Sequence, residues 1–229
     1  MAKFTPGAII SEIRGTIAST TFSKNAAGAI IRNRVTPINR NSLAQNIQRQ
    51  IFANISSNWR GLTQSQRNSW IEATPDFPYQ DSLGQTKFLT GAQLHQKLNL
   101  NRLVIGESLI ASAPPQTSFP EFSIGAVAAT ASTLTAAFDP DPIPAGFAAV
   151  FYATRPLSAG KDFVSKSEFR VVQVEDPAAV SPADLFTNYT QKISGLAGQS
   201  GKKVFVEMRL IEIASGIAST TVRGVAVVA

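Results

Sequence analysis

The chain has 229 residues, of which 44% are hydrophobic and 16% are charged, so it holds enough apolar side chains for one large core or two smaller ones. The absence of cysteine and the single histidine exclude disulfides, thiolate metal sites, cysteine nucleophiles and sites built from several histidines. The formal net charge is +6, but residues 1–110 hold 12 Lys and Arg against 5 Asp and Glu, whereas residues 111–229 hold 9 against 10. Asn and Gln are equally uneven, with 19 of the 24 placed before Ala111. This asymmetry predicts two domains with different surfaces.

A β-ribbon is expected over residues 8–35. Segments 8–14, 16–22 and 29–35 are rich in isoleucine, threonine and other strand-forming residues. The hairpin turn is expected at residues 25–28, because the Asn and Gly at its two ends both tolerate a positive φ.

Three helices are expected after the ribbon. The first covers residues 42–60, where apolar residues recur at every fourth position, namely Leu43, Ile47, Ile51, Ile55 and Trp59. The second runs from Thr63 to Ala73 and the third begins at Thr90. Thr63 with Gln66 and Thr90 with Gln93 have the spacing of capping boxes. The two tryptophans, Trp59 and Trp70, fall on apolar helix faces and are expected in the core.

Short strands are expected in the second half of the chain. The prolines of residues 113–121 indicate an extended linker, so the predicted domains are residues 1–112 and residues 122–229. Seven strands are predicted, over residues 124–129, 133–138, 147–154, 168–174, 185–193, 203–212 and 217–228. Seven strands in about 110 residues are typical of an all-β sandwich. The expected fold is therefore an α+β N-terminal module, with a β-ribbon and about three helices, followed by this sandwich.

The last two predicted strands carry a resemblance to a known family. The segment KVFVEMRL at 203–210, the turn ASG at 214–216 and the segment IASTTV at 217–222 resemble the last two strands of a fibronectin type III or related immunoglobulin-like domain. The resemblance implies a seven-stranded sandwich of that kind.

The N-terminal module resembles one found in structural proteins of tailed bacteriophages and prophages. Four segments carry the resemblance, namely GTIASTTFS at 15–23, IRNRVTPIN at 31–39, SLAQ at 42–45 and WRGLTQSQRNSW at 59–70. It implies a virion component that is soluble in the host cytoplasm before assembly and that contacts other virion proteins, such as major capsid or neck and tail proteins. A capsid-associated or decorating homo-oligomer is the favoured role, and a head–tail connector or a tail or fibre attachment protein is the alternative.

Enzymatic chemistry is not expected, and no cofactor or small-molecule substrate is predicted. The chain has no Gly-x-Ser-x-Gly elbow, no Walker motif and no Gly-rich dinucleotide loop. His95 lies on a predicted helix, where a structural or solvent-exposed role is expected. Asp139 and Asp141 alternate with prolines, which is typical of a turn between strands and offers few ligands to a metal ion. The longest apolar stretch, residues 147–153, is far shorter than the ~18 residues of a membrane span.

Basic residues of the N-terminal module are the predicted contact sites. Residues 1–71 hold nine Lys and Arg but a single acid, Glu12. Arg32, Arg34, Arg40 and Arg49 are predicted to contact an assembly partner or a polyanion. A basic DNA-associated protein is therefore a further alternative, less favoured because no cluster of lysines and no exposed aromatic platform is evident. A carbohydrate-binding adhesin on the sandwich is a third class that rests on fold analogy alone.

Overall fold

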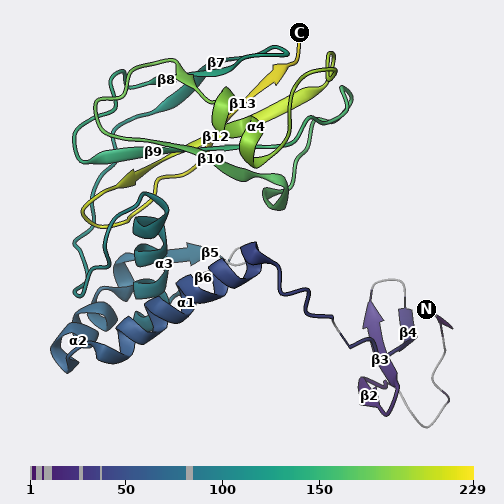
Figure 1. The fold of residues 1–229 in the computed structure, drawn as a ribbon. Coiled ribbons are helices and arrows are strands. Elements are labelled where there is room, and N and C mark those ends of the chain that lie inside the picture. Colours follow the sequence, from purple (N-terminus) through teal and green to yellow (C-terminus); the bar gives the residue numbers. More distant parts are fainter. Residues whose placement is uncertain (1, 4–6, 8–11, 26–27, 37, 81–84) are drawn as a thin grey trace. The chain divides into compact units, whose positions relative to one another are not determined.

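The structure is a computed structural model that describes residues 2–3, 7, 12–25, 28–36, 38–80 and 85–229. The chain forms two compact units, Met1–Asn46 and Ile47–Ala229. It has a mixed α+β fold, and its C-terminal part is rich in antiparallel β-sheet (Figure 1). The described residues contain four α-helices.

The first unit holds a small antiparallel sheet in the order β1-β4-β3-β2. Its strands are β1 (Ala2–Lys3), β2 (Gly15–Ile17), β3 (Thr20–Asn25) and β4 (Gly28–Asn33). Asn25 pairs with Gly28, as the predicted hairpin requires. Gly28 has a φ of 111°, a value that favours glycine.

Two of the predicted strands in this unit need correction. Residues 16–22 do not form one strand, because a turn at Ala18 and Ser19 separates β2 from β3. Ala18 adopts a φ of 50°, and neither turn residue is Gly or Asn, so the turn gives no sequence signal. The predicted strand at residues 8–14 lies largely outside the described residues, and residues 12–14 are not in a strand.

The predicted helices are present as α1 (Leu43–Gly61), α2 (Gln64–Glu72) and α3 (Gly91–Val104). Both capping boxes are confirmed. The Thr63 and Thr90 hydroxyls accept from the amides of Gln66 and Gln93 at 3.3 Å, and each Gln side chain accepts from the amide of its threonine at 2.9 Å. At α1, the hydroxyl of Ser42 accepts from the Gln45 amide at 3.3 Å. A short hairpin, β5 (Pro78–Gln80) with β6 (Thr86–Phe88), precedes α3 and was not predicted.

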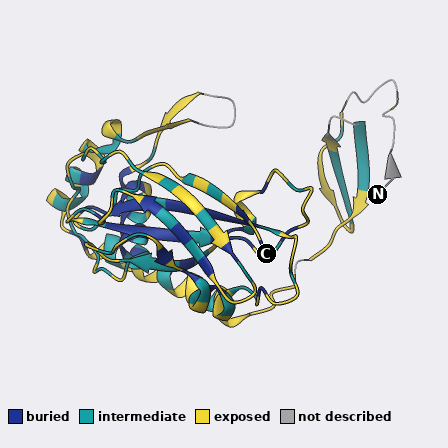
Figure 2. Ribbon diagram, turned by 90° about the horizontal axis from the view of Figure 1, so that it is seen from above, coloured by how far each residue is buried: buried dark blue, intermediate teal, exposed yellow. Residues whose placement is uncertain are grey.

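The β-rich part contains two antiparallel sheets. One has the order β11-β8-β7, with strands Ala183–Asp184, Leu134–Asp139 and Ser123–Ala129. The other has the order β10-β9-β12-β13, with strands Arg170–Glu175, Phe147–Ala153, Lys203–Glu212 and Val222–Val227. The larger apolar core of this part draws residues from both sheets, including Leu134, Phe151, Val206, Met208 and Leu210. Figure 2 shows these buried stretches in dark blue.

One predicted strand of this part is a helix. Residues 185–193 contain α4 (Phe186–Lys192) instead of a strand. Leu185 and Tyr189 lie one helical turn apart and are both fully buried. The Asp184 carboxylate, one residue before the N-cap position Leu185, accepts from the Phe186 amide at 3.0 Å. The Tyr189 hydroxyl donates to Thr154 O at 2.9 Å, which fixes the helix on the sheet.

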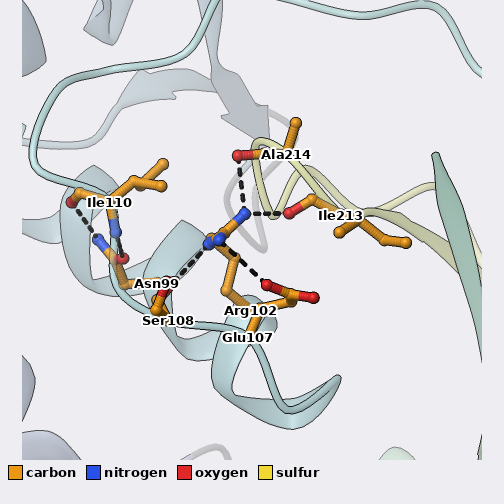
Figure 3. A network of polar contacts seen from close by, with 7 residues as sticks. All are labelled: Asn99, Arg102, Glu107, Ser108, Ile110, Ile213 and Ala214. Carbon is orange, nitrogen blue, oxygen red and sulfur yellow. Dashed lines mark hydrogen bonds and ion pairs between the residues drawn. The ribbon is translucent and has the colours of Figure 1, made fainter.

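Helix α3 is bonded to the turn between β12 and β13 (Figure 3). The Arg102 side chain, almost fully buried, donates to Ser108 O at 2.7 Å, to Ala214 O at 2.8 Å and to Ile213 O. The Asn101 amide donates to Gly216 O at 2.9 Å. These bonds join the helical part of residues 47–229 to its β-rich part.

The predicted linker at residues 113–121 packs on both of these parts. The Ala113 amide donates to the Ser69 hydroxyl at 3.3 Å, and the Phe119 ring lies 5.5 Å from the Phe147 ring. Ala111, two residues before this segment, accepts a hydrogen bond from Trp70 Nε1 at its carbonyl oxygen, at 2.9 Å. The segment is therefore bound along its length, and the domain boundaries at 112 and 122 stay a prediction.

Candidate assembly interface

Large apolar side chains of the first unit, on β2 and in the segment that follows β4, are exposed to solvent. No residue of 12–46 whose burial is described belongs to the buried class. Ile17 is 67% exposed, Val35 80% and Ile38 89%. Apolar surface of this kind costs free energy in water and marks interaction sites when it is contiguous.

The apolar stripe of α1 is covered only toward its C-terminal end. Ile55 is fully buried, whereas Leu43 is 77% exposed and Ile47 and Phe52 are each 45% exposed. Helix α1 has 19 residues and α2 has nine, so α2 spans less than half of the ~28 Å length of α1. The C-terminal half of α1 contacts α3, where His95 Nε2 lies 3.2 Å from the Asn58 side-chain oxygen and the Gln96 side-chain amide donates to the Ser56 hydroxyl at 3.3 Å.

The four predicted contact arginines are all exposed. Arg32 lies on β4 opposite Thr21, and Arg34 follows β4, with its backbone amide donating to Ser19 O at 2.7 Å. Arg40 lies in the segment before α1. These three belong to residues 1–46, and Arg49 lies on α1 within residues 47–229.

Glu12, the sole acid of residues 1–71, already forms ion pairs with two nearby cations. The Glu12 carboxylate lies 2.9 Å from the Arg14 guanidinium and 3.4 Å from the Lys24 ammonium. The hydrogen bond from Arg14 is the main cause that lowers the pKa of Glu12, with Lys24 adding to it. Arg32, Arg34 and Arg40 therefore meet no remaining carboxylate within their own stretch of sequence. The surface of residues 12–46 combines uncompensated positive charge with exposed apolar side chains.

His95 is a buried structural residue rather than a solvent-exposed one. Its ring is fully buried between Trp59 and Trp70, with ring centroids 5.4 and 5.1 Å away. Nε2 lies 3.2 Å from the Asn58 side-chain oxygen, and Nδ1 is buried without a hydrogen-bond partner among the described residues. Desolvation by this burial lowers the pKa of His95.

We expect acid to destabilise the helical part through this histidine. The pKa of His95 lies below its ordinary value of 6.5 in the folded chain, so the unfolded chain binds the proton at a higher pH than the folded chain does. The contribution of this group is complete above about pH 7 and is lost as the pH falls through 6.5 toward the lowered pKa. Urea denaturation at about pH 7.5, 6.5 and 5.5 measures it.

The matched variant is His95→Gln, which cannot titrate in this range. Its free energy of unfolding should change less between about pH 7.5 and 5.5 than that of the parent chain. Because the chain has one histidine, equal pH dependence of both proteins would contradict the assignment.

The acidic residues of the described chain form no metal centre. No group of three or more His, Asp or Glu side chains with suitable geometry occurs in the part of the chain that the structure describes. Asp139 ends β8, and the Asp141 carboxylate accepts from the Ser181 amide at 3.0 Å, so the predicted turn is confirmed. None of the helices in the described ranges has the length and apolar character that a membrane span requires.

Comparison of the chain with models of protein families gave no match, and comparison with curated proteins found no similar sequence.

Proposed function

We propose that this chain is a non-enzymatic structural component of a bacteriophage particle, anchored through its basic N-terminal module. One observation carries the proposal, namely that residues 12–46 expose Ile17, Val35 and Ile38 while burying no described side chain. A small sheet without a core of its own is marginally stable in water. A protein surface that covers it supplies the missing burial, and the resemblance of segments 15–23, 31–39 and 59–70 to phage structural proteins indicates a virion surface.

The partner surface is apolar with an acidic rim. It must bury the three isoleucine and valine side chains and offer carboxylates to Arg32, Arg34 and Arg40. The capsid-associated or decorating role is proposed first, with a major capsid protein as the partner that would present such a surface. A connector or a tail or fibre attachment protein would use the same mode of anchoring.

The C-terminal part is proposed to be a fibronectin type III-like sandwich. Its seven strands are divided three and four between two antiparallel sheets that share one core, which supports this assignment. Two helical elements depart from a purely all-β arrangement, namely the 3-10 helix Lys166–Glu168 before β10 and α4 between β11 and β12. In the proposed particle this part projects away from the anchor or contacts neighbouring subunits.

Removal of residues 1–36 tests the anchoring role. This truncation removes the sheet and leaves α1 intact, so we expect a folded chain that no longer self-associates and is absent from particles. Sedimentation gives the oligomeric state, circular dichroism checks the fold, and mass spectrometry of purified particles gives the copy number. Val35→Ser with Ile38→Ser serves as the milder variant, with reduced copy number expected. Incorporation of the truncated chain at the wild-type level would place the anchor elsewhere.

DNA binding is the second candidate, because Arg32, Arg34 and Arg40 are exposed and the one acid of residues 1–71, Glu12, is bonded to Arg14 and Lys24. If this surface binds DNA functionally, the affinity should fall steeply with salt, by about one log unit per tenfold salt for each phosphate neutralised. Changing Arg32, Arg34, Arg40 and Arg49 to Ser should then abolish binding in a filter or fluorescence assay. Equal weak binding by the parent and the variant at physiological salt would reject this function.

A further inference from the structure

Two hollows on the β-rich part share the segment 166–170 as a wall. The first, of about 400 Å³, is lined by Arg155, Ser167, Glu168, Arg170, Lys192 and Ile193. The second, of about 230 Å³, is lined by Tyr152, Lys166, Phe169, Glu207, Arg209 and Thr221. Because residues of this one segment line both hollows, the segment separates them.

The hollows collect positive charge from a half of the chain that is nearly neutral. Five of the nine Lys and Arg residues of 111–229 line them, namely Arg155, Lys166, Arg170, Lys192 and Arg209. No ion pair between described residues joins any of the five to a carboxylate. Three of the other four cations are paired, as Lys161 with Glu168 at 2.8 Å, Lys203 with Asp162 at 2.6 Å and Arg223 with Glu207 at 2.5 Å.

The pairing pattern leaves net positive charge in both hollows. Glu168 and Glu207 are the only carboxylates in the two linings, and each is bonded to a cation that lines neither hollow. Two of the five lining cations, Arg170 and Lys192, are held by backbone carbonyl oxygens instead. Arg170 donates to Ser167 O at 2.7 Å, and Lys192 donates to Val172 O at 2.6 Å. The positive groups are thus positioned but not neutralised, which is the arrangement of a preformed anion site.

Stacked bases are a poor fit to this surface. The guanidinium of Arg223 lies over the Phe169 ring at 5.0 Å, and that of Arg209 lies over the Tyr152 ring at 5.2 Å. Single-stranded nucleic acids depend on open aromatic faces for much of their affinity. Both rings of the second hollow already carry a cation on one face.

An added peptide strand is also a poor fit. Strand β10 borders the first hollow and is an edge strand, but α4 packs against it. The Lys192 ammonium donates to the Val172 carbonyl oxygen, and the Asn188 side-chain amide donates to the Gln173 side chain at 2.9 Å. A covered edge does not accept a further strand.

We propose that the two hollows bind an acidic saccharide, a sugar chain that carries carboxylate groups. Planar guanidinium groups such as those of Arg155 and Arg170 bind carboxylates in a bidentate manner. The hydroxyls of Ser167 and Thr221 in the linings pair with sugar hydroxyls, which a nucleic-acid backbone provides sparsely. Two adjacent hollows match successive units of one chain. This site is separate from residues 1–46 and does not depend on the role proposed for them.

Calorimetry with a linear trimer of galacturonic acid tests the proposal on the full chain. We expect binding of the trimer and none of maltotriose, a neutral trimer of similar size. The double variant Arg155→Gln with Arg170→Gln should weaken binding by about tenfold or more, because each change removes a charged donor that pairs with a carboxylate of the trimer. The matched control, Lys97→Gln with Lys202→Gln, removes the same charge from exposed positions outside the hollows and should leave binding unchanged.

Four outcomes would overturn the proposal. They are no binding of the acidic trimer, equal binding of maltotriose, equal weakening by the control pair, and tighter binding of an oligothymidylate that the Arg155 and Arg170 changes also weaken. The last outcome would assign the hollows to nucleic acid. Circular dichroism of both double variants excludes loss of folding as the cause.

Discussion

Gly216→Ala should be among the most destabilising single substitutions in this chain. Gly216 has a φ of 74°, and a Cβ at this position would lie 2.3 Å from Leu98 O and 2.8 Å from Arg102 Cγ. The first of these atoms belongs to the backbone of α3, so relief requires the helix to move away from the turn after β12. We expect the free energy of unfolding to fall by about 3 kcal/mol, measured by urea denaturation.

Gly198→Ala is the matched control for backbone conformation. Its φ of 71° is almost the same, but a Cβ there would meet nothing within 4 Å. We expect its free energy of unfolding to fall by about 1 kcal/mol, which is the cost of placing a residue with a Cβ in the left-handed conformation. Equal losses at the two positions would show that the contact between α3 and the turn is not tight.

Arg102→Met should break the polar attachment of α3 while keeping an apolar stem of similar length. The three carbonyls of Ser108, Ile213 and Ala214 would lose a charged donor, and Met cannot replace it (Figure 3). Because these groups are largely buried, we expect a loss of about 3 kcal/mol. Hydrogen exchange should locate the loosened amides in α3 and in residues 213–217.

Lys97→Met provides the comparison on the same helix. Lys97 is exposed and has no hydrogen bond or ion pair with a described residue, so its loss should change stability by less than about 0.5 kcal/mol. If Lys97→Met destabilised the chain as much as Arg102→Met does, general charge loss rather than the carbonyl contacts would explain both.

The helices and most strands of this fold are readable from local sequence. The capping boxes at Thr63 and Thr90 place two helix starts to the residue, because a cap and its reciprocal amide are neighbours in the chain. Helix α4 was missed because seven residues are too few to separate helical from strand periodicity. The hydrogen bond from Tyr189 to Thr154 holds this helix on the sheet, and it joins residues too far apart in the chain for a local pattern to show it.

The candidate sites divide in the same way. The exposed arginines of residues 1–46 are readable because nearly all nearby charges have one sign. The cations of the two hollows cannot be recognised from the sequence, because the net charge of residues 111–229 is close to zero. Which cations are paired depends on contacts such as Arg223 with Glu207, formed by the register of β12 against β13. Sequence shows the number of charges but not their partners.

The way the helices begin affects how the protein responds to its surroundings. The first turns of α1, α2 and α3 contain no acidic residue, and uncharged hydroxyl oxygens accept from the amides of their first turns. A carboxylate in that place would lose its charge in acid and be screened by electrolyte. A neutral cap has no charge to titrate or to screen. The starts of these helices should therefore hold equally well in dilute buffer and in brine.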